Sequence, residues 1–220
     1  MGTPLPYLNN LHDKIKGNRF MPKVVSADEI KKQLFDYTPD KAGEFHSASA
    51  KLADKLFYEE IKKDRYKQVI FLNGGTASGK TEFLSTHLNH RKGIIFDATL
   101  STELGADIKF KRVLKLRKIP VVYAVIPDDI NRAFIAFLNR DRKFGDTHFY
   151  QTHSGSRKTL LWIASNYPQV QIHIIESSYT QKQEMAFTRI EFDSRNELIK
   201  YLNNIQMSES DIISLIQSKL

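Results

Sequence analysis

One eight-residue segment constrains this chain more than any other part of its sequence. Residues 74–81 match the pattern G-x-x-x-x-G-K-[ST]. An apolar run of strand type, residues 68–73, precedes the segment, and residues 82–88 follow with helical spacing of apolar side chains. In this order, backbone amides and the positive end of a helix dipole face an anion. We therefore predict a phosphate-binding loop made of Gly74, Gly75, Thr76, Ala77, Ser78, Gly79, Lys80 and Thr81.

Three residues in and near this loop suggest how a nucleotide would be held. Lys80 would reach the β- and γ-phosphates of ATP or GTP, and the Thr81 hydroxyl would bind Mg²⁺. Asp97 ends the apolar strand at residues 93–97. Phosphate-loop proteins place the acid that holds Mg²⁺ at such a strand end, and Mg²⁺ prefers oxygen ligands. The alternative for Asp97 is a residue that only stabilises a turn.

The rest of the chain alternates strands with amphipathic helices. We expect strands at 120–126, 170–175 and 187–192, and helices at 47–63, 103–118, 156–166, 194–204 and 208–219, with another capped by Asp128 or Asp129. This alternation predicts the α/β class, with a P-loop kinase-like three-layer architecture around a mostly parallel sheet. Its ligand should lie over the carboxyl ends of the strands. Residues 1–44 would form a helical N-terminal extension to a domain at 45–220.

Composition and charge narrow the class of protein. There are no cysteines, which leaves neither disulfides nor thiolate metal sites. The longest apolar stretch, residues 121–126, is far too short to span a membrane, and the first residues lack a signal pattern. We expect a cytoplasmic protein without a membrane partner. The net charge of +8 fits either a phosphate site or nucleic acid. We interpret the basic cluster at 109–118 as the solvated face of a helix.

A basic segment from residue 140 onwards is a candidate lid. Arg140, Arg142 and Lys143 follow one predicted helix, and Arg157 lies near the start of the next. Cations at these positions would stabilise the negative charge of a phosphoryl group in transfer. The alternative is surface charge. His148 and His153 lie close by without a carboxylate or a third histidine, which argues against zinc.

The segment at residues 69–81 resembles the first strand and loop of zeta-toxin-type kinases, and the resemblance extends over roughly residues 45–180. It implies ATP- or GTP-dependent phosphorylation of a small hydroxylated acceptor, typically a UDP-amino-sugar, and an antitoxin-like protein partner. Lys80 would be the loop lysine and Asp97 the strand-end acid. Arg140 or Arg142, with Arg157, would match the lid arginines. Ser177 and its neighbours would approach the nucleotide base.

One feature of that family has no counterpart at the expected place. The family has an additional strand after the loop helix, ending in the aspartate that acts as catalytic base, but only thirteen residues separate Lys80 from Ile94. Asp97 would then serve twice, or another acid would act as base, or the activity would be lost; the other acids are Asp128, Asp129 and Glu103. Two further hypotheses remain: a nucleotide-binding module that acts through a partner or nucleic acid, and a polynucleotide kinase.

Overall fold

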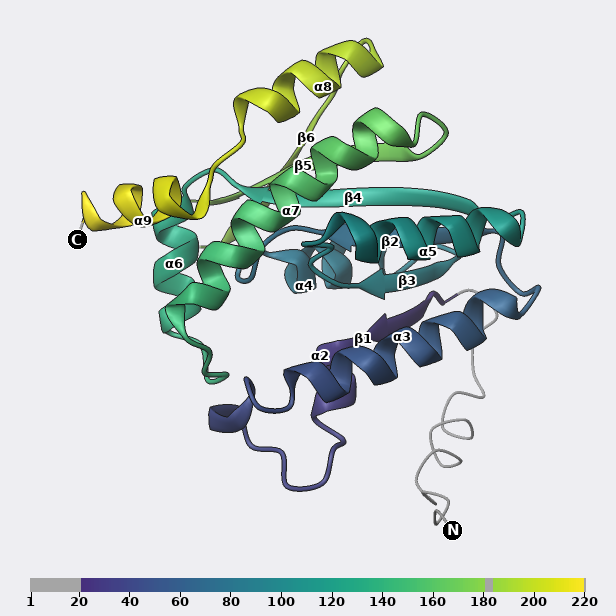
Figure 1. Cartoon of the computed structure of the whole chain (residues 1–220), viewed down its shortest axis with the longest axis horizontal. Coiled ribbons are helices and arrows are strands. Elements are labelled where there is room, and N and C mark those ends of the chain that lie inside the picture. Colours follow the sequence, from purple (N-terminus) through teal and green to yellow (C-terminus); the bar gives the residue numbers. More distant parts are fainter. Residues whose placement is uncertain (1–20, 181–183, 220) are drawn as a thin grey trace.

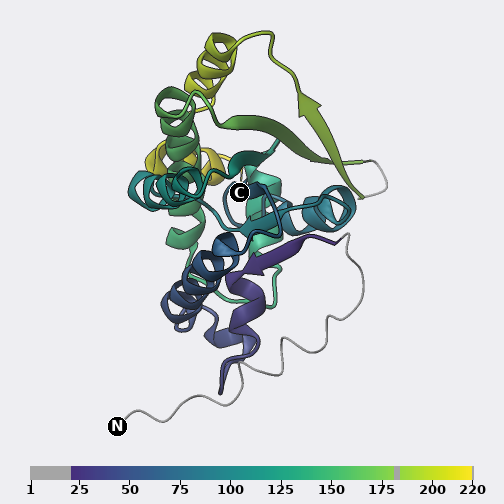
Figure 2. The ribbon, with the colours of Figure 1, turned by 90° about the vertical axis from the view of Figure 1, so that its right-hand side faces the viewer.

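The computed structural model describes residues 21–180 and 184–219, and residues 1–20 of the predicted N-terminal extension lie outside them. The fold is α/β, and a six-stranded sheet forms its centre (Figure 1). The strands are arranged in the order β1-β3-β2-β4-β5-β6, and all neighbours are parallel except β5 and β6. Figure 2 shows β1 and β6 at opposite ends of the sheet. The strands are β1 (Lys23–Ser26), β2 (Gln68–Asn73), β3 (Ile94–Asp97), β4 (Ile119–Pro127), β5 (Gln171–Tyr179) and β6 (Met185–Ile190).

Helices cover both faces of this sheet. They are α2 (Ala27–Lys31), the 3₁₀ turn η2 (Pro39–Lys41), α3 (His46–Lys62), α4 (Lys80–Phe83), the π-helical turn η3 (Leu84–Leu88), α5 (Glu103–Lys115), α6 (Ile130–Leu138), α7 (Asp146–Asn166), α8 (Arg195–Asn204) and α9 (Glu209–Gln217). Alternate residues of β2 point to opposite faces. Phe71 belongs to a core cluster that includes residues of α3, α5, α7 and α8, whereas Leu72 belongs to a cluster that includes residues of α4 and η3. The predicted α/β class and the mostly parallel sheet are confirmed. None of the helices in the described residues combines the length and the apolar character that crossing a membrane requires.

The core beside β2 and β3 is aromatic. The ring of Phe57 lies 4.6 Å from that of Phe96, and the ring of Phe71 lies 4.8 Å from that of Phe110, measured between centroids. All four rings are buried. Tilted and edge-to-face pairs of this kind add to the free energy gained by burial. This cluster fixes α3 and α5 against the strands whose carboxyl ends carry the predicted site.

Three predictions about the elements were wrong. Helix α7 begins at Asp146 rather than near residue 156. The spacing of Ile30, Leu34 and Phe35 after a helix start at residues 26–29 predicts one helix that buries all three, but α2 ends at Lys31 and Phe35 is exposed. The apolar spacing of residues 103–118 predicts that Leu104 and Ile108 are buried, but both are exposed on α5, which buries Ala106, Lys109, Phe110 and Val113 instead.

Strand β1 was not predicted at all. Residues 23–26 pair in parallel with residues 94–97 of β3, so part of the predicted N-terminal extension forms an edge of the central sheet. Four residues are too few to show a strand period, and their pairing partner is distant in sequence. The edge position matters for function because β1 delivers α2 to the carboxyl end of the sheet.

Candidate functional site

The predicted phosphate loop joins β2 to α4 and is almost wholly buried. Gly74 and Gly79 have φ angles of 138° and 88°, where a side chain would be strained. A Cβ atom on Gly74 would also lie 2.3 Å from the Val125 carbonyl oxygen. Both glycines of the motif are therefore required by the backbone. Ser177 of β5 donates a 2.8 Å hydrogen bond to the Ser78 carbonyl and so supports the loop from outside the cleft.

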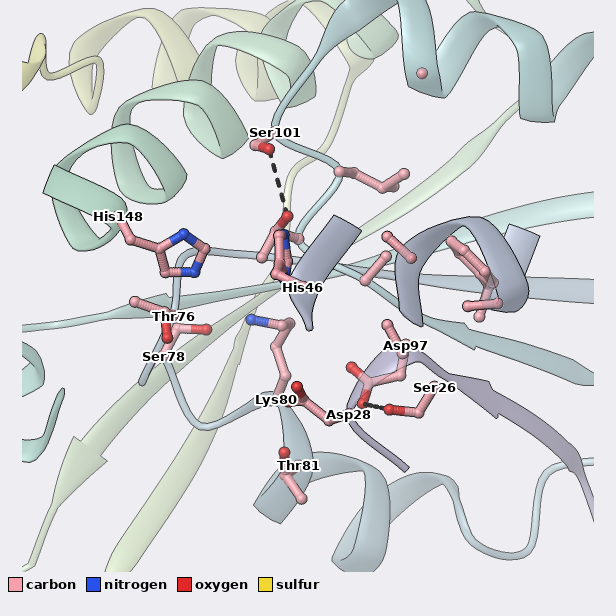
Figure 3. Close-up of a pocket in the computed structure, with 18 of the residues that line it drawn as sticks. Ser26, Asp28, His46, Thr76, Ser78, Lys80, Thr81, Asp97, Ser101 and His148 are labelled. Carbon is pink, nitrogen blue, oxygen red and sulfur yellow. Dashed lines mark hydrogen bonds between the residues drawn. The ribbon is translucent and has the colours of Figure 1, made fainter. Parts of the chain in front are cut away.

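Lys80 lies at the mouth of this loop. Its Nζ donates hydrogen bonds of 2.8 and 2.7 Å to the carbonyls of Gly74 and Gly75. Burial lowers the pKa of Lys80 to about 8, although the nearby Asp97 carboxylate opposes this effect. Figure 3 shows Lys80, Asp28 and Asp97 gathered in one part of the cleft, close to Thr81. The ammonium is thus held against the backbone of the loop.

Asp97 and Thr81 bring oxygen atoms of the kind that Mg²⁺ prefers into the cleft. Asp97 ends β3 and accepts a 3.1 Å hydrogen bond from the Ser26 hydroxyl. Burial raises the pKa of Asp97, and Lys80 counteracts this rise. The Thr81 side chain lines the same cleft from the start of α4. Within residues 21–180 and 184–219, no three His, Cys, Asp or Glu residues form a metal-binding group, but Mg²⁺ commonly uses one or two carboxylates with water and phosphate oxygens. The donors fit this ion.

Asp28 is the residue that the sequence interpretation missed, because it looked like an ordinary acid in the first turn of a helix. It lies just after β1 and lines the cleft. Its carboxylate forms ion pairs with Arg142 and, at 3.3 Å, with Lys31. Burial alone would raise the pKa of Asp28, but Arg142 and Lys31 together hold it below its usual value. Asp28 is therefore a charged carboxylate beside the phosphate loop.

The other acids considered as catalytic base do not line the cleft. Asp129 caps α6 by accepting a 2.8 Å hydrogen bond from the Asn131 amide. Glu103 lies 3.9 Å from Lys158, and Asp128 is exposed. Among the described acids that line the cleft, Asp28 and Asp97 lie beside Lys80, and Asp54 lies farther along the wall.

The candidate lid arginines divide into two groups. Arg140 and Arg142 lie between α6 and α7 and line the cleft. Arg140 donates a 3.2 Å hydrogen bond from Nη1 to the Thr76 hydroxyl, and burial lowers its pKa. Arg157 instead lies in the middle of α7, buried and outside the cleft, where it contacts His153. Lys143, predicted beside the arginines, is exposed.

The cleft has a volume of about 300 Å³ and continues from the loop along α3 and α5. Asp54 and Lys109 form a 3.0 Å ion pair in its wall. His148 stacks on Phe144 with centroids 4.4 Å apart, and burial, with neighbouring His46, lowers the pKa of His148 to about 4. Hydroxyl groups of Thr99, Ser101 and Thr102 also line this part. The cleft therefore extends beyond the phosphate loop and is lined there by charged and hydroxyl groups.

The basic cluster on α5 is only partly solvated, contrary to the sequence interpretation. Lys109 is buried in its ion pair, and Lys118 donates hydrogen bonds of 2.9 and 2.5 Å to the carbonyls of Lys63 and Tyr66. The remaining basic residues are exposed: Lys111, Arg112, Lys115 and Arg117. They lie towards the C-terminal end of α5, whereas the cleft lies at its N-terminal end.

Comparisons with known proteins leave the family of this chain open. No protein-family model and no curated protein matches it. Solved structures that resemble it include crystal structures of the complex AvrRxo1-ORF1:AvrRxo1-ORF2. The one with sulphate ions has a TM-score of 0.48 at 11% identity and covers 69% of this chain and 68% of that chain. The one with ATP has a TM-score of 0.47 at 12% identity and covers 76% of each chain. The native complex has a TM-score of 0.45 at 12% identity, covering 73% and 74%. With TM-scores below 0.5, these likenesses establish neither a family nor an activity.

Proposed function

We propose that this chain is a phosphotransferase of the P-loop type, which binds ATP or GTP at residues 74–81 and transfers the γ-phosphoryl group to a hydroxyl of a small acceptor in the cleft. The observation that carries the proposal is the convergence of Lys80, two carboxylates and two arginines on one cleft. These groups come from four separate segments of the chain. Phosphoryl transfer needs such a set, because its catalysis consists mainly of positioning and electrostatic stabilisation.

Each group has a distinct role in the proposal. Lys80 and the loop amides hold the β- and γ-phosphates, and Thr81 and Asp97 hold Mg²⁺. The ion, when bound, supplies charge neutralisation at the phosphate oxygens. Arg140 and Arg142 stabilise the charge that spreads over the equatorial oxygens of the moving group.

Asp28 acts as the catalytic base. Its carboxylate accepts the proton of the acceptor hydroxyl while the hydroxyl oxygen bonds to the γ-phosphorus. The bond from that phosphorus to the bridging oxygen breaks, and the nucleoside diphosphate leaves. Lys31 and Arg142 keep Asp28 ionised, so its carboxylate carries no proton before the transfer.

The position of β1 supports this assignment. The zeta-toxin-type kinases that the loop resembles carry their base on a strand that this chain lacks after the loop helix. Here β1 precedes the loop in sequence, lies beside β3 at the edge of the sheet, and leads into Asp28. We propose that β1 takes the place of that strand. A UDP-amino-sugar acceptor and an antitoxin-like partner rest on the resemblance alone and remain part of the proposal.

The polynucleotide kinase hypothesis has less support. The exposed basic residues of α5 lie at the end of the helix that points away from the cleft. A polynucleotide that reached them would have to extend along the whole helix from the phosphate loop. A small acceptor fits the cleft without that requirement.

The test follows the label of [γ-³²P]ATP into UDP-amino-sugars, an oligonucleotide and water. We expect transfer to the sugar nucleotide, and Asp28→Asn should lower it by about a hundredfold or more while MgATP still binds. Asp97→Asn should lower transfer similarly and also raise the Mg²⁺ concentration required. Exposed Asp128→Asn is the matched control and should match the wild type. Label found only in the oligonucleotide would refute the small acceptor, and a near-wild-type rate for Asp28→Asn would refute its role as base.

A further inference from the structure

Helix α7 buries a polar face. Thr152, His153, Ser156 and Arg157 are between 0% and 6% exposed. Polar groups in such a position destabilise a protein unless they form hydrogen bonds. Thr152 and His153 find partners on the phosphate loop, whereas the side chains of Ser156 and Arg157 bond to His153 within α7. Ser156 also accepts a 3.2 Å hydrogen bond at its carbonyl from Asn73, the last residue of β2.

Two of these residues hold Thr76, the third residue of the loop. The Thr76 amide donates a 3.1 Å hydrogen bond to the Thr152 hydroxyl. The Thr76 carbonyl lies 2.8 Å from Nε2 of His153. Its hydroxyl accepts the hydrogen bond from Arg140 described above. Both backbone polar groups of Thr76 are thus engaged by α7, and its side chain by the lid segment.

The contacts determine the protonation state of His153. The Thr76 carbonyl can only accept, so Nε2 of His153 carries the hydrogen. Nδ1 is then free to accept from Nη1 of Arg157, which lies 3.3 Å away. Burial and the charge of Arg157 hold the pKa of His153 well below its usual value. His153 is therefore a neutral donor whose tautomer is set by the Thr76 carbonyl together with Arg157.

The ring of His153 also explains Gly75. A Cβ atom on Gly75 would lie 2.3 Å from the ring carbons of His153, which no packing can accommodate. The φ angle of Gly75 is not in the left-handed region, so the residue is a glycine for lack of space. The phosphate-loop motif itself leaves this position open to any residue. Position 75 is therefore a glycine because the His153 ring leaves no room for a side chain.

We propose that His153, oriented by Arg157, is a positioning residue that holds the phosphate loop in its binding conformation before the nucleotide arrives. Holding the loop in advance removes part of the ordering cost that a bound nucleotide would otherwise bear. This role also accounts for Arg157, a buried guanidinium that forms no salt bridge to a carboxylate in the described parts of the chain. Arg157 acts through His153 rather than on the phosphate. The inference rests on the proposed nucleotide binding at residues 74–81.

The first test compares two amide substitutions. In His153→Gln the side-chain amide nitrogen occupies the position of Nε2 and can still donate to Thr76. In His153→Asn the shorter side chain reaches only the position of Nδ1, so this hydrogen bond is lost. We expect the Kd for MgATP, measured by calorimetry, to rise about tenfold in His153→Asn and less than about threefold in His153→Gln. Urea unfolding of both variants separates this effect from a general loss of stability. Equal Kd values for the two variants would overturn the proposal.

The second test is a double-mutant cycle with Gly75→Ala and His153→Ala. In the wild-type background, Gly75→Ala should weaken MgATP binding more than tenfold, because the new methyl group displaces the loop from His153. In the His153→Ala background the same substitution should raise the Kd for MgATP less than about twofold. Additive losses would show that the two residues are not coupled. A wild-type chain that binds no MgATP refutes the proposed function and this inference together, whereas wild-type binding with unaffected variants refutes only the role of His153.

Discussion

Removal of the Asp28 carboxylate should reveal the cost of burying Lys31. The Lys31 side chain is 0% exposed, and its contacts are the Asp28 carboxylate at 3.3 Å and the Phe144 ring, whose centroid lies 4.9 Å from Nζ. Asp28→Ala would leave this ammonium buried without an anionic partner among the described residues. Breaking a fully buried ion pair costs about 3–5 kcal/mol. Since the Asp28 side chain is 42% exposed, water screens the pair, and we expect a loss of about 2 kcal/mol.

This magnitude can be measured by urea unfolding. Fluorescence of Trp162, the single tryptophan, follows the transition. A loss of about 2 kcal/mol corresponds to a fall in Tm of about 4–8 °C for a chain of this size. Glu29→Ala, which removes the exposed pair with Lys32, is the matched control and should cost less than about 0.5 kcal/mol.

A second substitution tests the cause of that loss. Asp28→Ala combined with Lys31→Met removes both charges and should recover at least about 1 kcal/mol relative to Asp28→Ala alone. If Asp28→Ala costs no more than Glu29→Ala, or if the double variant is less stable than Asp28→Ala, the ion pair does not stabilise α2 in the way inferred here.

Two further predictions concern the cleft. Arg140→Ala and Arg142→Ala should lower the rate of phosphoryl transfer more than the affinity for MgATP, because the proposed interactions of these arginines with the phosphoryl group form mainly in the transition state. The control Lys143→Ala should change neither the rate nor the affinity. Losses of affinity without a change in rate would contradict the prediction. Because the neutral form of His148 is favoured in the folded chain, its contribution to stability is complete above about pH 6.5 and is lost as the pH falls towards about 4. We expect the free energy of unfolding to fall by about 1–2 kcal/mol over this range. The full pKa shift would give about 3 kcal/mol, but the ring is partly solvated, which reduces the effect. In urea unfolding without nucleotide, His148→Gln should flatten the dependence of the unfolding free energy on pH. An unchanged dependence would contradict the role of His148.

Local sequence patterns sufficed for the centre of the fold. Strands β2, β3 and β4 are buried on both faces, which produces continuous apolar runs that are recognisable without knowledge of their partners. The phosphate loop was predictable because its glycines are required by the backbone itself. The order of elements alone therefore sufficed to place Lys80 and Asp97 at the carboxyl ends of neighbouring strands.

The parts that could not be predicted depend on contacts between distant residues. Strand β1 is defined by pairing Lys23 with Ile94, and nothing in its own four residues signals that pairing. As a result, Asp28 could not be recognised as part of the site. The first half of α7 was missed because Thr152 and His153 face the phosphate loop instead of an apolar core, which removes the helical period of apolar residues.

The most direct test of the central claim is the stabilisation of the folded chain by MgATP. At a hundredfold excess over Kd, binding to the native state adds about 2.7 kcal/mol and should raise the Tm of the wild type by about 5–10 °C. Lys80→Ala should lose most of this shift, because its ammonium is the principal cation at the loop, whereas exposed Lys143→Ala should retain it. Equal stabilisation of the wild type and Lys80→Ala would contradict nucleotide binding at residues 74–81.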